Sequence, residues 1–247
     1  ENMIGADSFL SSAIRDLLEG EEKAYFDRYV ATVEPSIGRM VPKTPAHISE
    51  KEPLAICVEP YCELPVDRDA FKGEIPQITN MVPFEPFDFY IKRKLYVHNM
   101  GHAICAYMGD LLGLEYIYEA IAVPHIRILV QNAMLERAMA LSRKYGASLY
   151  DLQLHITDLL GRFTNAALKD TCYRVGGDPA RKLSPADRLI GSASLALEQG
   201  VCPAYIAMGA ACGLRRYLAE QPEDQKLTAA EVLQTVSGLK ETDRLYR

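Results

Sequence analysis

The sequence predicts a mainly α-helical fold, a multi-helical domain preceded by a small extended or β layer at the N-terminus. Three observations predict it. From about residue 87 onward, apolar side chains recur at helical spacing, with glycine or proline near the expected helix ends. Eight prolines crowd residues 42–86 and disfavour continuous helix there. The chain also lacks a G-x-G-x-x-G or G-x-x-x-x-G-K loop, so we expect no doubly wound sheet.

The bulk composition is that of a folded protein with an ordinary core. Of the 247 residues, 49% are hydrophobic and 24% are charged, and the net charge of −6 argues against a dedicated nucleic-acid-binding protein. No apolar run approaches the roughly 20 residues that span a bilayer, and no signal peptide is visible. The six cysteines include no C-x-x-C pair, so we expect reduced, mostly buried thiols in a cytoplasmic protein.

Residues 1–86 are expected to form the N-terminal layer. Apolar side chains at helical spacing predict a helix over residues 8–18, and Gly20 follows its end. The stretches 30–41 and 54–64 are short, β-branched and interrupted by proline, which favours strands or extended segments.

Residues 87–247 are expected to form a helical bundle within the same single domain. Pro124 suits the first turn of a helix, and Gly146 suits the end of one. The predicted helices cover about residues 87–112, 124–145, 148–161, 165–175, 185–199, 203–220 and 228–237.

The segment 91–109 carries the most informative pattern in the chain. At about 100° per residue, four hydrogen-bonding side chains fall within an arc of roughly 140° on one side of an otherwise apolar helix. They are Lys94, His98, Asn99 and His102. One interpretation is that they mark the solvent face. Against it, a lysine buried among apolar neighbours is costly unless it is paired or used in chemistry.

Metal binding is a second interpretation of the same segment. His98 and His102 are spaced i, i+4, which suits zinc or another divalent ion. No Glu stands between them in an H-E-x-x-H arrangement, and further ligands would have to come from distant residues such as Glu59 or Glu63. We therefore expect no metal.

The spacing Lys94-x4-Asn99-x2-His102 resembles the signature of the polyol-specific long-chain dehydrogenases, the mannitol dehydrogenase family. Four collinear blocks carry the resemblance: ENM (1–3), EPYCELPVDRDAFKG (59–73), RKLYVHNMGHA (93–103) and RKLSPADRLIG (181–191). Gly38 departs from the family pattern, which often has Asp-Arg where this chain has Gly38-Arg39, and it could alter substrate contacts or domain docking.

The resemblance implies a two-domain enzyme, with an N-terminal Rossmann domain that binds NAD and a helical C-terminal domain that supplies substrate contacts. Because the chain opens on Glu1 and lacks a glycine-rich loop, we expect it to be the second domain, with the Rossmann domain absent from this chain and located upstream in the same polypeptide. No cofactor-binding residue is assigned here. The chain alone would then be inactive, with no nucleic-acid or membrane partner.

The resemblance also implies roles for individual residues. Lys94 is the general base, Asn99 and Asn2 donate hydrogen bonds to the developing alkoxide, and His102 holds a substrate hydroxyl or orients the lysine. His98 is a weaker candidate, for packing or for a supporting hydrogen bond near the substrate. Cations for an anionic substrate group are offered by GRFTN and RKLSPADR: Arg162 (with Asn165), Arg181, Lys182 and Arg188. For each of these, a surface charge or a helix cap is an equal alternative.

The implied function is an NAD-dependent oxidoreductase that interconverts a polyol phosphate and a keto-sugar phosphate, preferably mannitol 1-phosphate and fructose 6-phosphate. Two alternatives stay open. A uronate reductase of the same family would use the same cations for a carboxylate, and a chain without a nucleotide domain could be a non-catalytic sugar-phosphate-binding module.

Overall fold

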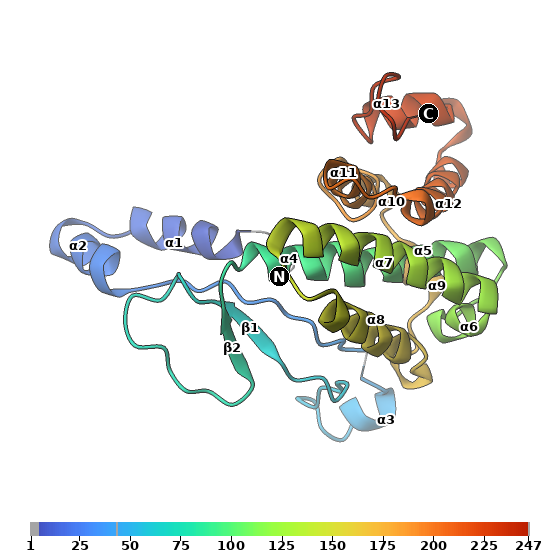
Figure 1. Ribbon diagram of the computed structural model, residues 1–247. Coiled ribbons are helices and arrows are strands. Elements are labelled where there is room, and N and C mark those ends of the chain that lie inside the picture. The colour runs from blue at the N-terminus through green and yellow to red at the C-terminus, as the bar shows by residue number, and fades with distance from the viewer. Residues whose placement is uncertain (1–4, 43, 247) are drawn as a thin grey trace. The chain divides into compact units, whose positions relative to one another are not determined.

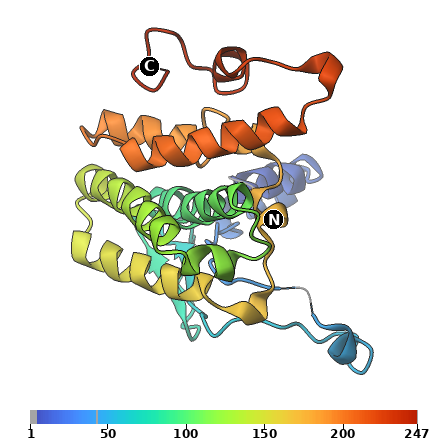
Figure 2. The same cartoon turned by 90° about the vertical axis from the view of Figure 1, so that its right-hand side faces the viewer.

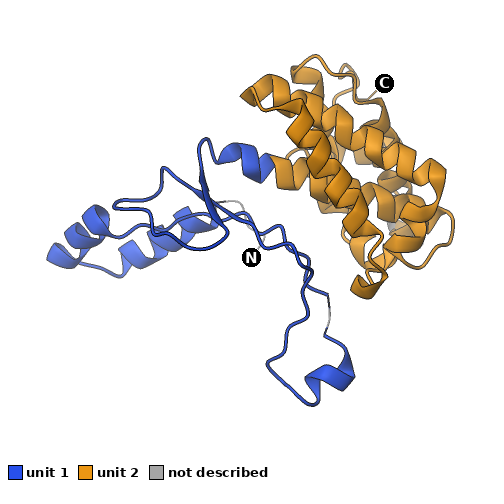
Figure 3. Ribbon diagram, turned by 60° about the horizontal axis from the view of Figure 1, so that its bottom comes forward, with its two compact units in different colours: residues 1–92 blue, residues 93–247 orange. Residues whose placement is uncertain are grey.

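The computed structural model describes residues 5–42 and 44–246, and it divides the chain into two compact units, Glu1–Lys92 and Arg93–Arg247 (Figure 3). The predicted division at residues 86 and 87 within one domain stays a prediction. None of the helices in the described ranges is long and apolar enough to cross a membrane.

The first unit contains short elements around a small parallel sheet. They are α1 (Ala6–Asp16), α2 (Gly20–Tyr29), α3 (Ala46–Ser49), β1 (Leu64–Asp67), β2 (Met81–Phe84) and α4 (Asp88–Arg93), whose last residue falls in the second unit. β1 pairs with β2 in parallel, with Leu64 opposite Met81 and Val66 opposite Pro83. The sheet has two strands, so β2 is an edge strand, where Pro83 is tolerated although it lacks an N–H group.

The predictions for this unit are partly wrong. The helix expected over residues 8–18 is α1, but the sequence analysis missed α2, which begins at Gly20. The stretches 30–41 and 54–64 contain no paired strand except the first residue of β1, and within them Pro35 forms an isolated bridge to Val66. The two strands lie further along the chain, at residues 64–67 and 81–84. Their positions are determined by backbone pairing between distant segments, which amino-acid composition does not reveal.

The second unit is a helical bundle. Its elements are η1 (Lys94–Asn99), α5 (Met100–Leu111), α6 (Ile117–Ala122), α7 (Pro124–Tyr145), α8 (Leu149–Phe163), η2 (Ala166–Leu168), α9 (Cys172–Gly176), α10 (Pro179–Lys182), α11 (Ile190–Glu198), α12 (Ala204–Glu220), η3 (Glu223–Gln225) and α13 (Ala229–Thr235). Helices α5 and α7 form its centre, with α11 and α12 on one side and α8 on the other (Figures 1 and 2).

Helix ends in the bundle follow local chemistry. As predicted, α7 begins with Pro124 in its first turn and ends before Gly146, which adopts a positive φ of 67°. The core lies where α5 meets its neighbours, and the side chains of Met100, Ile104 and Met134 are fully buried there. The expected continuous helix over residues 87–112 is instead three consecutive pieces, α4, η1 and α5, of which η1 is a π-helix.

The cysteines differ in part from expectation. All six are free, but Cys105 and Cys172 alone are buried, whereas Cys62 and Cys202 are exposed. Composition predicted their reduced state better than their position, because a small apolar side chain is accepted at the surface as well as in the core.

Candidate functional site

The π-helix brings the signature residues onto one face. Lys94 and Asn99 are the first and last residues of η1, and His102 lies in the first turn of α5. A π-helix closes i→i+5 hydrogen bonds with about 4.4 residues per turn, so residues five apart lie about 50° from each other around the axis. Over this segment the arc that spans Lys94, Asn99 and His102 narrows from about 140° in a continuous α-helix to about 60°.

Lys94 lies partly buried where η1 packs against α7 and α8. Burial lowers the pKa of its ammonium group, and the nearby positive charge of Arg188 lowers this pKa further. Arg188 lies in the loop between α10 and α11, and this loop is fixed to η1 because the Tyr96 hydroxyl donates a hydrogen bond to the Ala186 carbonyl at 3.1 Å. The lysine is therefore shifted towards the neutral form that a general base requires.

His102 is held by an aromatic ring and a carboxylate. Its ring stacks on Phe163 of α8, with centroids 4.8 Å apart and an angle of 17° between the planes. Its Nε2 atom lies 3.5 Å from Oδ2 of Asp170. Burial lowers the pKa of His102 to about 4, although the Asp170 carboxylate acts in the opposite direction. The imidazole is therefore neutral near pH 7.

His98 lies in η1, four residues before His102, and its ring is close to the same aromatic ring. It is buried, and its ring centroid is 6.2 Å from that of His102 and 5.9 Å from that of Phe163. Burial lowers its pKa well below the ordinary value, and His102 and Arg162 add to the shift. This position suits the packing role that the sequence analysis considered for it.

Three of the residues predicted to bind an anionic group have protein partners of their own. Asn165 caps η2 by accepting a hydrogen bond from the Ala167 amide at 3.0 Å. Arg181 is exposed and forms ion pairs with Asp178 and Asp187. Arg162 pairs with Asp158, one helical turn away, at 3.6 Å. These contacts correspond to the alternative of helix caps and surface charges.

Lys182 differs from the other cations. It is 5% exposed, and burial together with Arg188 and Arg181 lowers the pKa of its ammonium group to about 8. Within the described ranges, no hydrogen bond or ion pair engages its Nζ atom. Lys182 and Arg188 also lower the pKa of His102 electrostatically, which places both cations near the signature helix. The carboxylates of Asp178 and Asp187 raise this pKa, but less than burial and the two arginines lower it, so an anionic ligand would be favourable beside the ammonium group.

Asn2 lies outside the described residues, so its predicted role stays a prediction. In the described part of the chain, no group of three or more His, Cys, Asp or Glu side chains could share a metal ion.

The sequence analysis missed Asp170 and Phe163. Asp170 lies 68 positions after His102, and no spacing rule connects the two residues. The sequence signal nearest to Asp170 is the i, i+4 spacing to Arg174, which pairs with its other carboxylate oxygen.

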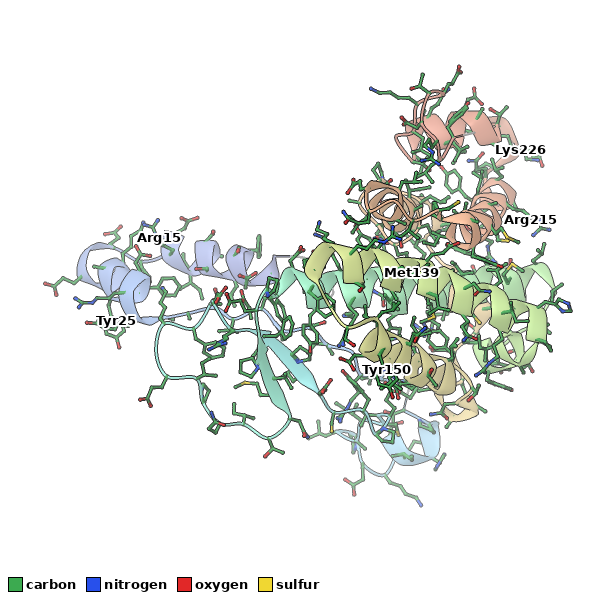
Figure 4. All side chains as sticks on the ribbon, in the orientation of Figure 1. Arg15, Tyr25, Met139, Tyr150, Arg215 and Lys226 are labelled. Atoms are coloured by element: carbon green, nitrogen blue, oxygen red, sulfur yellow. The ribbon has the colours of Figure 1, made fainter. Side chains whose placement is uncertain are left out.

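Two open clefts lie elsewhere on the bundle. One, of about 480 Å³, lies between α7 and α8 and is lined in part by Met139, which Figure 4 labels. The other, of about 570 Å³, lies beside the C-terminal end of α12 and includes Tyr217. Neither is lined by Lys94, Asn99 or His102.

Comparisons with known proteins agree with the signature. The family model "Mannitol dehydrogenase C-terminal domain" matches residues 87–243, and the model "Mannitol dehydrogenase Rossmann domain" matches residues 1–80. Mannitol 2-dehydrogenase from Pseudomonas fluorescens, solved with NAD and D-mannitol, is 17% identical with a TM-score of 0.66, over 96% of this chain and 51% of that one. A substrate-free D-sorbitol dehydrogenase is 18% identical with a TM-score of 0.65, over 83% of this chain and 43% of that one.

At these identities the two structures show a shared fold, and the chain spans about half of their length. The expectation that the Rossmann domain is absent from this chain is wrong, because its family model matches residues 1–80. The expectation relied on the missing glycine-rich loop. That loop marks a single strand-to-helix turn of such a domain, so a segment can belong to the domain without containing it.

Proposed function

The chain belongs to the mannitol dehydrogenase family. From this premise we propose that it forms the catalytic and substrate-binding part of an NAD-dependent polyol dehydrogenase of the mannitol-1-phosphate 5-dehydrogenase type. The reaction interconverts mannitol 1-phosphate and fructose 6-phosphate. The observation that carries the proposal is the common face of Lys94, Asn99 and His102 on η1 and α5, close to the buried cation Lys182. The two similar solved structures are named for unphosphorylated polyols, so the phosphate is the specific part of this proposal.

NAD would supply the hydride acceptor for the oxidation of the alcohol. The described residues include no glycine-rich turn of the kind that holds the pyrophosphate of a dinucleotide. Residues 1–80 match the Rossmann-domain model, so this segment is proposed to contribute to the NAD site without that turn.

Lys94 is proposed to accept the proton of the reacting hydroxyl group. Its pKa is lowered by burial and by Arg188, so neutral amine is available closer to neutral pH than in an exposed lysine. The Asn99 amide lies on the same face and would donate a hydrogen bond to the oxygen as negative charge develops there. Asn2, outside the described residues, is proposed as the second donor.

The phosphate is proposed to bind near Lys182, with Arg188 as a second cation and a smaller contribution from Arg162, Asn165 and Arg181. Lys182 is preferred because it is 5% exposed and no carboxylate of the described residues lies within ion-pair distance of it, whereas Arg181 is exposed and paired with two carboxylates. The same cations fit a carboxylate. A uronate reductase of the same family is therefore the second candidate.

The first test is NAD-linked oxidation of mannitol 1-phosphate by the full-length protein. Lys94→Ala should lower kcat at least about 100-fold, because the base is lost. Lys144→Ala, an exposed lysine at the end of α7, is the matched control and should have little effect. Full activity in Lys94→Ala would contradict the assigned base.

Substrate choice is tested with a second variant. Lys182→Ala should raise KM for mannitol 1-phosphate by about tenfold or more and leave KM for mannitol nearly unchanged, since the loss of one charge-assisted contact costs about 1.5–3 kcal/mol. Turnover of a uronate but not of mannitol 1-phosphate would favour the uronate reductase. Binding without turnover of any of these compounds would favour a non-catalytic module.

A further inference from the structure

Asp170 is the carboxylate that faces His102. Its Oδ2 atom lies 3.5 Å from the imidazole Nε2 atom, and both side chains are largely buried, with exposed fractions of 13% and 16%. The other carboxylate oxygen accepts a hydrogen bond from the Arg174 guanidinium. One oxygen is thus occupied by arginine, and the other is the carboxylate atom that lies near the histidine nitrogen.

The backbone holds Asp170 in this place. Its carbonyl accepts a hydrogen bond from the Ile117 amide at 2.9 Å, and the Cys172 amide donates to the Glu115 carbonyl at 2.8 Å. Between them, Thr171 forms an antiparallel bridge with Tyr116. The segment that carries Asp170 is therefore tied to the start of α6 independently of its side chain.

The imidazole ring has little freedom to turn away. Its stacking on Phe163 fixes the ring plane, and α5 packs closely against α9, where a Cβ atom on Gly109 would meet Cys172 Sγ at 2.6 Å. With the ring fixed, the carboxylate decides which of the two nitrogens carries the single proton of a neutral imidazole.

We propose that Asp170 is a positioning residue that keeps the proton of His102 on Nε2 and leaves Nδ1 as a hydrogen-bond acceptor. A neutral imidazole with a free Nδ1 accepts a hydrogen bond from a polyol hydroxyl group. It therefore favours a substrate with a hydroxyl group at the position that faces Nδ1, and it disfavours a carbonyl oxygen or a hydrogen atom there. The role towards the polyol rests on the proposed function, but the tautomer does not.

The tautomer is measured directly by nitrogen-15 NMR of the chain with labelled histidine. His102→Ala identifies the His102 signals among those of the five histidines. The unmodified chain should show the Nε2–H form at His102. Asp170→Asn should move it to a mixture with the Nδ1–H form, because asparagine offers a donor as well as an acceptor.

Two variants serve as controls. Asp178→Asn removes another arginine-paired aspartate and should leave the His102 tautomer unchanged. Arg174→Ala removes the guanidinium but keeps the carboxylate, so the Nε2–H form should persist. An Nδ1–H form in the unmodified chain, or an unchanged tautomer in a folded Asp170→Asn variant, would overturn the proposal whether or not the protein oxidises polyols.

Kinetics of the full-length enzyme then test the link to the reaction. Asp170→Asn should lower kcat/KM by about tenfold, and it should add less than about twofold in a His102→Ala background, because both changes remove the same oriented acceptor. Independent effects that multiply would show that Asp170 does not act through His102.

Discussion

Glu136 and Lys182 are both almost fully buried charged side chains of the bundle, but they have different surroundings. The Glu136 carboxylate accepts hydrogen bonds from the amides of Tyr205 at 2.9 Å and Ile206 at 3.0 Å, at the N-terminus of α12. There it satisfies two amides that have no partner within the helix. Lys182 has no such contacts in the described part of the chain. We therefore assign a structural role to Glu136 and reserve Lys182 for a ligand.

A substitution at Glu136 should destabilise the fold. Glu136→Ala leaves the two amides without this acceptor, that of Ile206 in a buried position, and we expect the free energy of unfolding to fall by about 2–3 kcal/mol. Glu136→Gln keeps one acceptor oxygen and should cost less. Urea unfolding followed by circular dichroism measures both. The control is Glu223→Ala, whose exposed pairing with Lys226 is worth less than about 1 kcal/mol.

At the scale of elements, η1 decides how the signature residues face one another. A π-turn is supported when nearby groups bind the backbone that leaves the α-helical pattern. The Tyr96 carbonyl of η1 faces the Ser192 hydroxyl at 3.5 Å, and the Tyr96 hydroxyl bonds the Ala186 carbonyl. The Arg137 guanidinium lies over the Tyr96 ring, 4.5 Å from its centroid. Helices distant in sequence thus stabilise η1.

Replacing glycine by alanine should have opposite effects on the free energy of unfolding at two helical positions. A Cβ atom on Gly209 of α12 would lie 2.4 Å from Cγ1 of Ile104 in α5, so Gly209→Ala should lower the free energy of unfolding by about 1–3 kcal/mol. A Cβ atom on Gly161 of α8 would meet nothing within 4 Å, so Gly161→Ala should stabilise by about 0.5–1 kcal/mol. Thermal unfolding of both variants checks the pair. Equal shifts would contradict the close packing of α5 against α12.

At the scale of the whole molecule, one buried histidine, His98, and two partly buried ones, His102 and His155, affect how stability depends on pH. The pKa of His155 is lowered to about 3 and that of His102 to about 4, in both cases chiefly by burial, and that of His98 is lowered as well. Each has an ordinary value of 6.5, so below that pH the unfolded chain binds protons that the folded chain does not. The contribution of these neutral histidines to the stability of the fold is fully present above pH 6.5. It is lost as the pH falls towards 4 and then 3.

The free energy of unfolding should therefore fall between pH 6.5 and pH 4, with each histidine contributing at most about 1.4 kcal/mol per pH unit. Urea unfolding at pH 7, 6, 5 and 4.5 measures the slope. His155→Gln should reduce it, whereas His125→Gln, at an exposed position in α7, should leave it unchanged. A slope that does not respond to His155→Gln would show that this histidine is not buried in its neutral form.

The sequence by itself determined the positions of the long helices and the family. Pro124 and Gly146 set the bounds of α7 through rules that act within one helical turn, and the collinear blocks around Lys94 and Lys182 identify relatives without reference to packing. The tertiary structure alone decided which charges are buried, that η1 is a π-helix, and that Asp170 meets His102 across 68 residues. Such contacts depend on how helices pack, and spacing along one element does not encode them. The missing glycine-rich loop led to the wrong prediction that the Rossmann domain is absent, because one local motif does not report on a whole domain.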